Sequence, residues 1–392
     1  MTGYVDYRGS PTSGRRPASM SFRQNNLVGK FASLPWGLIS LVIALALIGT
    51  AMLYSSTITN PEEGNLPAKH FSRFVMTLPI MLGLALVPLR LWMRVAAPAY
   101  IVTVIMLLGV EFFGTVRGGA QRWLDVGPTL VQPSEFMKVA LILALARYYQ
   151  LTLDGRSGGL LVHLGALALI MVPAALIIKQ PDLGTTLTLV AIGGITIYFA
   201  GLRWRVILPV FGLGIVGSFF AYHYLLEPYQ KKRVETLWNP GADPLGAGYQ
   251  SEQAKIAIGS GGWDGKGFTQ GTQSQLDYIP EQHTDFIYTV IAEEFGFLGA
   301  VGLLLLWASV IVWMLVIAAR SPSLFGRYAA VSASATVAFY VLFNVGMVAG
   351  LLPVVGIPMP LISYGGTAML TVMAAIGLVL AVDLHRTQQS TR

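Results

Sequence analysis

Residues 295–319 read FGFLGAVGLLLLWASVIVWMLVIAA, a run of twenty-five residues without a charged side chain. About 20 apolar residues in a helix cross the hydrocarbon core of a bilayer, so this run predicts a transmembrane helix. Directly before it, residues 281–294 read EQHTDFIYTVIAEE and carry four acidic side chains. Carboxylates next to lipid are costly unless they are paired, hydrated or used in a reaction. The sequence leaves these three possibilities open.

The whole chain has the composition of an integral membrane protein. Of its 392 residues, 54% are hydrophobic and 11% are charged, whereas a soluble protein carries roughly 25% charged residues. The chain contains no cysteine, which excludes disulfides and thiolate metal sites. Membrane orientation explains most of the net charge of +7, so we do not expect a nucleic-acid partner.

Ten segments are apolar and long enough to span a bilayer, and they predict an all-α integral membrane protein. They are 34–56, 72–90, 95–114, 134–150, 159–178, 183–201, 204–223, 286–319, 326–350 and 364–384. Because this number is even, both termini are expected on the same side of the membrane.

The distribution of basic residues places that side in the cytoplasm. With the N-terminus inside, most of the 26 Lys and Arg residues lie in the inner tails and short loops. The sequence therefore predicts a disordered cytoplasmic tail at 1–33, a transmembrane domain at 34–385 and a cytoplasmic C-terminal tail at 386–392. A large extracytoplasmic loop is expected at 224–284, between the seventh and eighth helices. Within this loop, residues 250–258 favour a short amphipathic helix.

Four polar clusters fall on the outer side in this topology, and together they indicate one extracytoplasmic cavity. They are GAQRWLDVGPTLVQPSEFMK (119–138), KQPDLGTT (179–186), EQHTDF (281–286) and GIPMPLISYGGT (356–367). For each cluster taken alone, ordinary capping of a helix at the membrane surface is the alternative explanation.

Two of the clusters place charged side chains at predicted helix starts. Ser134 is expected to cap a helix whose first turn holds Glu135, and Lys138 shares a face with that carboxylate. The pair is either a structural ion pair or an anchor for a phosphorylated head group. Asp182 is expected to cap the predicted helix at 183–201. Lys179 is a candidate for binding a pyrophosphate.

Asp285 follows Thr284 and precedes an apolar run, so its carboxylate is expected at the membrane–water boundary. There it could act as a general base toward a hydroxyl. His283 with Glu281 and Asp285 could ligate a metal ion, but one histidine and two carboxylates in a loop are a weak basis. We therefore assign no metal ligands.

The polar clusters, extended by GSGGWDGKGFTQGTQSQLDYIPEQHTDFIYTVIAEEFGFLG (259–299), resemble the signatures of the SEDS family, which comprises RodA, FtsW and SpoVE. The motifs occur in the family's order and cover nearly all of the chain past residue 33. Within the family, the sequences GTQSQLDYIPEQHTDF and PMPLISYGG most resemble those of RodA. The tail and the stretch at 57–70 are longer than the resemblance leads us to expect.

This resemblance implies a peptidoglycan glycosyltransferase that polymerises lipid II during cell elongation, on the outer face of the bacterial cytoplasmic (inner) membrane. It implies a class B penicillin-binding protein and other membrane proteins of the elongation complex as partners. The family's motifs carry over to Asp285 as the catalytic residue and to Glu135, Lys138 and Trp123.

The chemistry of that reaction adds further candidates. Arg122, Lys138 and Lys179 could stabilise the leaving pyrophosphate, with or without a divalent cation (Mg or Mn). The remaining candidates for binding substrate are Asp182, Gln273, Glu281, His283, Asn344 and Ser363.

Other functions stay open at this point. A lipid II flippase needs a polar path and access from both faces, whereas the polar motifs lie on one side only. A non-catalytic scaffold of the cell-wall synthesis complex would not need Asp285. A solute transporter is less favoured, because no inverted repeat is visible in the sequence.

Overall fold

The structure, a computed structural model, describes residues 27–60, 63–117, 120–126, 129–153, 159–202, 204–224, 226–239, 246–276 and 278–386. The chain divides into two units, one ending at Leu34 and one beginning at Pro35. Of the predicted tails, residues 1–26 and 387–392 lie outside the described residues. The first unit contains the helix α2 (Leu27–Ala32), so the prediction of disorder across 1–33 is wrong for these six residues. The run LVGKFA is mainly apolar, and its lysine lies in the last turn, where a cation suits the helix dipole.

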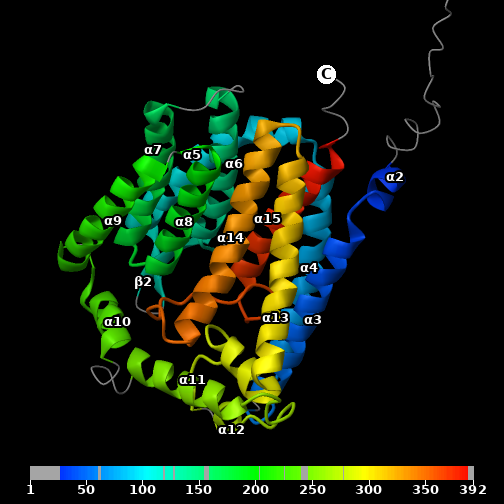
Figure 1. Ribbon diagram of the computed structural model, residues 1–392, viewed down its shortest axis with the longest axis vertical. Coiled ribbons are helices and arrows are strands. Elements are labelled where there is room, and N and C mark those ends of the chain that lie inside the picture. The colour runs from blue at the N-terminus through cyan, green and yellow to red at the C-terminus, as the bar shows by residue number, and fades with distance from the viewer. Residues whose placement is uncertain are drawn as a thin grey trace, which may run out of the picture. The chain divides into compact units, whose positions relative to one another are not determined.

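Long helices make up most of the second unit (Figure 1). Ten of them overlap the predicted spans, namely α3 (Trp36–Thr57), α4 (Leu66–Leu86), α5 (Leu89–Phe113), α6 (Pro133–Leu153), α7 (Leu160–Lys179), α8 (Leu183–Phe199), α9 (Trp204–Tyr224), α13 (Ile287–Arg320), α14 (Leu324–Val348) and α15 (Gly366–Leu384). Among the described residues, seven of these are long and apolar enough to cross a membrane, and the other three are α4, α8 and α9. The prediction of a helical, multi-pass membrane protein is confirmed at this level.

The second and third predicted spans are displaced in the sequence. Their helices, α4 and α5, begin about six residues earlier than the hydropathy pattern indicates. The pattern counts apolar residues only, whereas Pro67 in the first turn of α4 and Pro88 before α5 set the actual starts. The polar first turns of α4, with His70 and Arg73, therefore belong to the helix rather than to the loop before it.

A small antiparallel sheet departs from the all-α prediction. It consists of β1 (Thr115–Arg117), β2 (Ala120–Val126) and β3 (Thr129–Val131), with β2 in the middle. Thr, Val and Trp favour strands, and Gly-containing pairs separate the three segments in the sequence. β2 packs on the end of α5 and the start of α6, where Gln121 Nε2 donates to the Val110 carbonyl at 2.9 Å.

The core of the second unit lies around α14 and α15. α14 packs against α6, α8, α13 and α15, and α15 also packs along α4. In Figure 1 these two helices lie in the middle of the bundle. Their side chains are buried on nearly all sides, as expected for helices that are apolar all round.

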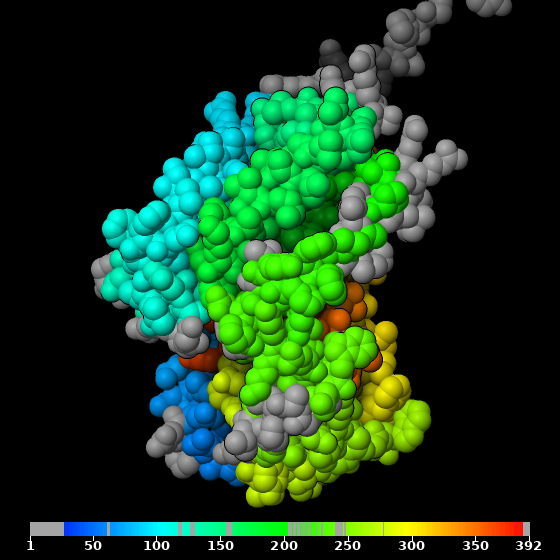
Figure 2. Space-filling model, turned by 90° about the vertical axis from the view of Figure 1, so that its left-hand side faces the viewer, coloured from blue at the N-terminus to red at the C-terminus, as the bar shows by residue number. Residues whose placement is uncertain are grey.

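The predicted outer loop at 224–284 folds into α10 (Pro228–Trp238), α11 (Ala247–Gly261) and the single turn α12 (Thr272–Gln275). α11 confirms the predicted short helix at 250–258. Figure 1 shows α9, α10 and α11 forming an arch at the edge of the bundle. Figure 2 shows the α9–α10 segment, in green, lying across the face turned toward the viewer.

α13 is broken at Gly296, whose φ of 63° and ψ of −161° leave the helical region. The loop between α11 and α12 fills the break with backbone hydrogen bonds. The amides of Lys266 and Gly267 donate to the carbonyls of Glu293 and Glu294, at 3.0 and 2.9 Å. The helix ends exposed by the break are thus satisfied by the loop between α11 and α12, which is held firmly to α13.

Candidate functional site

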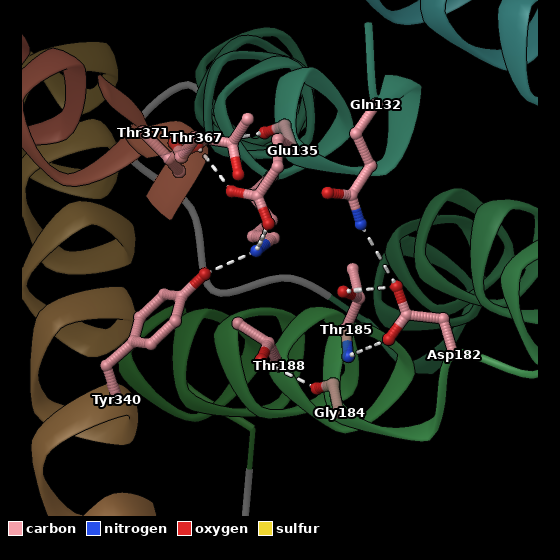
Figure 3. Close-up of polar contacts among 10 residues, drawn as sticks. Gln132, Glu135, Asp182, Gly184, Thr185, Thr188, Tyr340, Thr367 and Thr371 are labelled. Atoms are coloured by element: carbon pink, nitrogen blue, oxygen red, sulfur yellow. Dashed lines mark hydrogen bonds and ion pairs between the residues drawn. The ribbon is translucent and has the colours of Figure 1, made fainter. Parts of the chain in front are cut away.

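A polar cavity of about 150 Å³ lies where β2, the first turns of α6 and α8, and the segment 356–368 meet. Figure 3 shows its polar side chains arriving from α6, α8, α14 and α15. Its lining includes Arg122, Gln132, Glu135, Lys138, Asp182, Thr185, Tyr340, Gly356, Pro358, Gly365 and Thr367. The cavity therefore combines three of the four polar clusters that the sequence singled out.

The Glu135–Lys138 pair forms one wall of the cavity. Lys138 is 1% exposed and Glu135 8% exposed, and their Nζ and Oε1 atoms lie 2.6 Å apart. Lys138 also donates to the Tyr340 hydroxyl. Thr371 Oγ1 on α15 donates to the second carboxylate oxygen, Oε2, at 2.7 Å. Both charges are thus engaged within the protein, and the pair ties α6 to α14 and α15.

Ser134 does not cap α6. The helix starts one residue earlier, at Pro133, so Ser134 lies within its first turn. Proline is favoured at such a position because the first helical amides have no partner in the helix. The Ser134 hydroxyl is buried and has no hydrogen-bond partner among the described residues.

Asp182 caps α8, as predicted. Its Oδ1 accepts from the Thr185 amide at 3.1 Å, and its Oδ2 accepts from the Thr185 hydroxyl at 2.9 Å. Gln132, next to the start of α6, approaches the same Oδ2 with Nε2 at 3.5 Å (Figure 3). The cap therefore also links the starts of α6 and α8 across the cavity.

Arg122 enters the cavity from β2. Its guanidinium donates to the backbone carbonyls of Gln180, at 3.2 Å, and Pro181. Gln180 in turn donates to the Leu107 carbonyl at 2.9 Å. These contacts hold a cation in the cavity lining, beside the segment that precedes α8.

Asp285 lies on the turn that precedes α13 and is half-buried. Burial raises the pKa of its carboxyl to about 7, the like charge of Glu281 adds to this shift, and Arg233 on α10 opposes it. Its Oδ2 atom lies 3.5 Å from the point where a side chain on Gly356 would begin. Because Gly356 also lines the cavity, the carboxylate and the cavity share one boundary.

The segment between α14 and α15 is held by contacts to its own backbone and to α4. Ser363 Oγ accepts from the Met359 amide at 2.8 Å, and His70 Nε2 lies 3.0 Å from the Leu361 carbonyl. The Tyr364 amide donates to the His283 carbonyl at 2.9 Å. The Ser363 side chain is 3% exposed, so it braces this loop rather than projecting into the cavity.

Several predicted residues are not part of the cavity lining. Lys179 is exposed and pairs at 3.9 Å with Glu111, and Trp123 is half-buried in β2. Glu281 is exposed and accepts from the Thr284 hydroxyl at 2.8 Å. His283 Nδ1 lies 3.6 Å from a Glu63 carboxylate oxygen. None of these four side chains lines the cavity.

Gln273 belongs to a separate cluster around Glu293. The backbone amide of Gln273 donates to Glu293 Oε1 at 2.9 Å, and Lys266 Nζ lies 2.6 Å from the same oxygen. The neighbouring Glu294 accepts a hydrogen bond from Ser55 on α3. Of the acids before the long apolar run, Glu293 is paired with Lys266 and anchors the segment between α11 and α13, whereas Glu294 is buried and hydrogen-bonded to α3.

The structure adds residues that the sequence did not indicate. Gln132 and Thr185 lie within quoted clusters and could have been found there. Thr371 lies one turn beyond the cluster at 356–367. Tyr340 stands in an apolar transmembrane run, where nothing in the sequence separates it from a core aromatic residue.

Among the described residues, no group of three or more His, Asp or Glu side chains could hold a metal ion. The carboxylates of Glu135 and Asp182 are already engaged with Lys138, Thr371 and Thr185. These residues do not fit a preassembled site for a divalent cation, so we assign no reaction step to one.

Known proteins resemble this chain over nearly its full length. The family profile of the FtsW, RodA and SpoVE proteins, described as "Cell cycle protein", matches residues 35–388. The peptidoglycan glycosyltransferase MrdB of Escherichia coli (strain K12) is 43% identical over 352 residues, which cover 88% of this chain and 93% of MrdB.

Two solved structures share the fold. A chain from the work described as "Structural coordination of polymerization and crosslinking by a peptidoglycan synthase complex" superposes with a TM-score of 0.78 at 30% identity, over 91% of this chain and 99% of that one. The crystal structure of the Thermus thermophilus rod shape determining protein RodA superposes with a TM-score of 0.64 at 28% identity, over 90% and 98%.

Proposed function

The chain belongs to the FtsW, RodA and SpoVE family of cell cycle proteins, and we propose that it polymerises lipid II into the glycan strands of peptidoglycan. This membership confirms the SEDS resemblance read from the four motifs. The chain is a peptidoglycan glycosyltransferase, the activity by which its relative MrdB is named. The observation that carries the proposed chemistry is the position of Asp285 beside Gly356, on the boundary of the cavity.

Asp285 acts as the general base. It takes the proton from the 4-hydroxyl of the acceptor N-acetylglucosamine, and that oxygen attacks the anomeric carbon of a lipid-linked N-acetylmuramic acid. The bond from the anomeric carbon to the pyrophosphate oxygen breaks, and undecaprenyl pyrophosphate leaves with the electron pair. A carboxylate with a pKa of about 7 suits this role, since a base titrating near the working pH combines availability with strength.

Positive charge near the leaving pyrophosphate replaces the need for a general acid. Arg122 is the best-placed of the three cations predicted for this role, because it lines the cavity from β2. The charge of Lys138 is balanced by the Glu135 carboxylate at 2.6 Å, and Lys179 lies outside the lining. We therefore assign the pyrophosphate contact to Arg122 and a structural role to the Lys138 pair.

The setting of the reaction is part of the proposal. All ten helices span the bacterial cytoplasmic membrane, both termini lie in the cytoplasm, and the cavity opens on the outer side. A transpeptidase of the class B penicillin-binding proteins and elongation-complex membrane proteins are the partners. The similarity to a chain of a peptidoglycan synthase complex that coordinates polymerization and crosslinking supports this assembly.

The decisive experiment measures glycan polymerisation from purified lipid II in the presence of the cognate transpeptidase. The wild type is compared with Asp285→Asn and with Asp264→Asn, which removes an exposed acid from the same outer loop. We expect the Asp285→Asn protein to make no polymer and the Asp264→Asn protein to make as much polymer as the wild type. Full activity of a folded Asp285→Asn protein would remove Asp285 as the base. Absence of polymer with every protein, together with lipid II movement across vesicles, would favour a flippase.

A further inference from the structure

Asn344 lies at the point where the Asp285 turn meets the segment between α14 and α15. It stands near the end of α14 and is 0% exposed. Its Nδ2 atom donates to the Asp285 carbonyl and to the Ile357 carbonyl, both at 2.8 Å. Since both neighbours are acceptors only, the amide must face them with its NH₂ group.

The two carbonyls flank the proposed reaction centre. The first belongs to Asp285 itself, and the second follows Gly356, which the Asp285 carboxylate approaches. One side chain therefore sets the separation between the turn before α13 and the glycine that lines the cavity. Gly356 has a φ of 79°, a conformation that favours glycine and lets the carboxylate approach the backbone closely.

The rest of the turn has its own supports. The His283 carbonyl accepts from the Tyr364 amide, and the Phe286 amide donates to the Glu281 carbonyl at 3.2 Å. These bonds hold the turn as a whole, whereas the Asp285 carbonyl is held by Asn344. Removal of the Asn344 amide is thus expected to loosen the orientation of Asp285 while the turn and helix remain.

We propose that Asn344 is a positioning residue that holds the Asp285 carboxylate against Gly356 and toward the cavity. This inference rests on the proposed function, in which Asp285 is the base. It replaces the expectation that Asn344 binds substrate, because the side chain is 0% exposed and both hydrogens of its amide are donated to the protein backbone.

Three variants test the proposal. Asn344→Leu keeps the volume and removes both donors. Asn344→Asp keeps the shape and adds a negative charge near Asp285. The matched control is Ser334→Ala, which removes a hydroxyl that is 1% exposed on the same helix and bonds only one turn back, to the Ala330 carbonyl.

The readouts are kcat, KM for lipid II, and the pH at which kcat is half-maximal. Misplacing a reacting group by about 1 Å costs on the order of 10²-fold, so we expect Asn344→Leu to lower kcat by roughly that factor with KM within about threefold. The carboxyl is surrounded by Glu281 and Arg233, with His283 and Glu63 beside the turn. In Asn344→Leu, the loosened Asp285 carboxyl is less buried, which lowers its pKa and moves the pH midpoint down. In Asn344→Asp, the added negative charge raises the pKa of Asp285 and moves the midpoint up.

Several results would overturn the proposal. A raised KM with unchanged kcat would make Asn344 a substrate contact. A loss of activity that only follows the loss of folded protein, with an unchanged pH midpoint, would make its role structural.

The same set separates the two hypotheses. Wild-type activity in Asp285→Asn refutes the base and with it the proposed chemistry. An inactive Asp285→Asn protein combined with an unaffected Asn344→Leu protein refutes only the positioning role.

Discussion

The Glu135–Lys138 pair can be tested as a buried ion pair by removing its charges one at a time and together. Glu135→Gln leaves the Lys138 ammonium buried with Tyr340 as its main partner, and Lys138→Met leaves the Glu135 carboxylate with Thr371. Removing one partner of a buried pair costs about 3–5 kcal/mol, whereas replacing both is often nearly neutral. The double variant should therefore be more stable than either single variant.

The assay is thermal unfolding in detergent, in which the fraction of protein that still elutes as folded protein is measured after heating. At about 2 °C of Tm per kcal/mol for a large chain, each single variant should melt about 6–10 °C below the wild type. The exposed pair of Lys179 and Glu111, 3.9 Å apart, supplies the control. Its double replacement by Met and Gln should change Tm by no more than about 2 °C, because exposed pairs contribute about 0–1 kcal/mol.

Two results would refute the reasoning. Single variants that melt within about 2 °C of the wild type would show that the charges are hydrated rather than buried. A double variant whose decrease in Tm equals the sum of the decreases in the two single variants would show that the two residues do not act as a pair. If the double variant folds well and still lacks activity, the pair contacts substrate, which would favour the head-group anchor over the structural pair.

The remaining predictions concern the carboxylates and cations around the cavity. Because the pKa of Asp285 is raised to about 7 and the base must be ionised, kcat should rise with pH through about 7 and then level off. Glu281→Gln removes a like charge and should lower that midpoint, and an unchanged midpoint would exclude the coupling. Asp182→Ala should cost about 1 kcal/mol of stability through loss of the helix cap, measured by thermal unfolding, and Asp182→Asn should restore part of it. Lys179→Ala should leave lipid II polymerisation within about twofold, since exposed pairs contribute little, and a large loss would return Lys179 to the pyrophosphate site. Chelation of divalent cations by EDTA should leave thermal stability unchanged, because the described residues form no cluster for a metal ion, and a lowered Tm would reveal a site held by the protein.

The sequence by itself determined the class of fold and the position of most helices. A run such as 295–319 has no stable place except a bilayer or a protein core, and its length selects the bilayer. The same pattern could not place the starts of α4 and α5, because prolines rather than hydropathy set them. It also missed the sheet at 115–131, whose short strands gain their stability from packing on α5 and α6.

For the site, local chemistry predicted the Asp182 cap and the Glu135–Lys138 pair, because their partners lie three residues away in the sequence. The tertiary structure alone decided the roles of Tyr340 and Asn344, whose partners lie 202 and 59 residues away. It also separated Arg122, which lines the cavity, from Lys179, which does not. The physical reason is that hydrophobic patterning and capping act over one or two turns of chain. Which buried donor meets which acceptor depends instead on how α6, α8, α13 and α14 pack together.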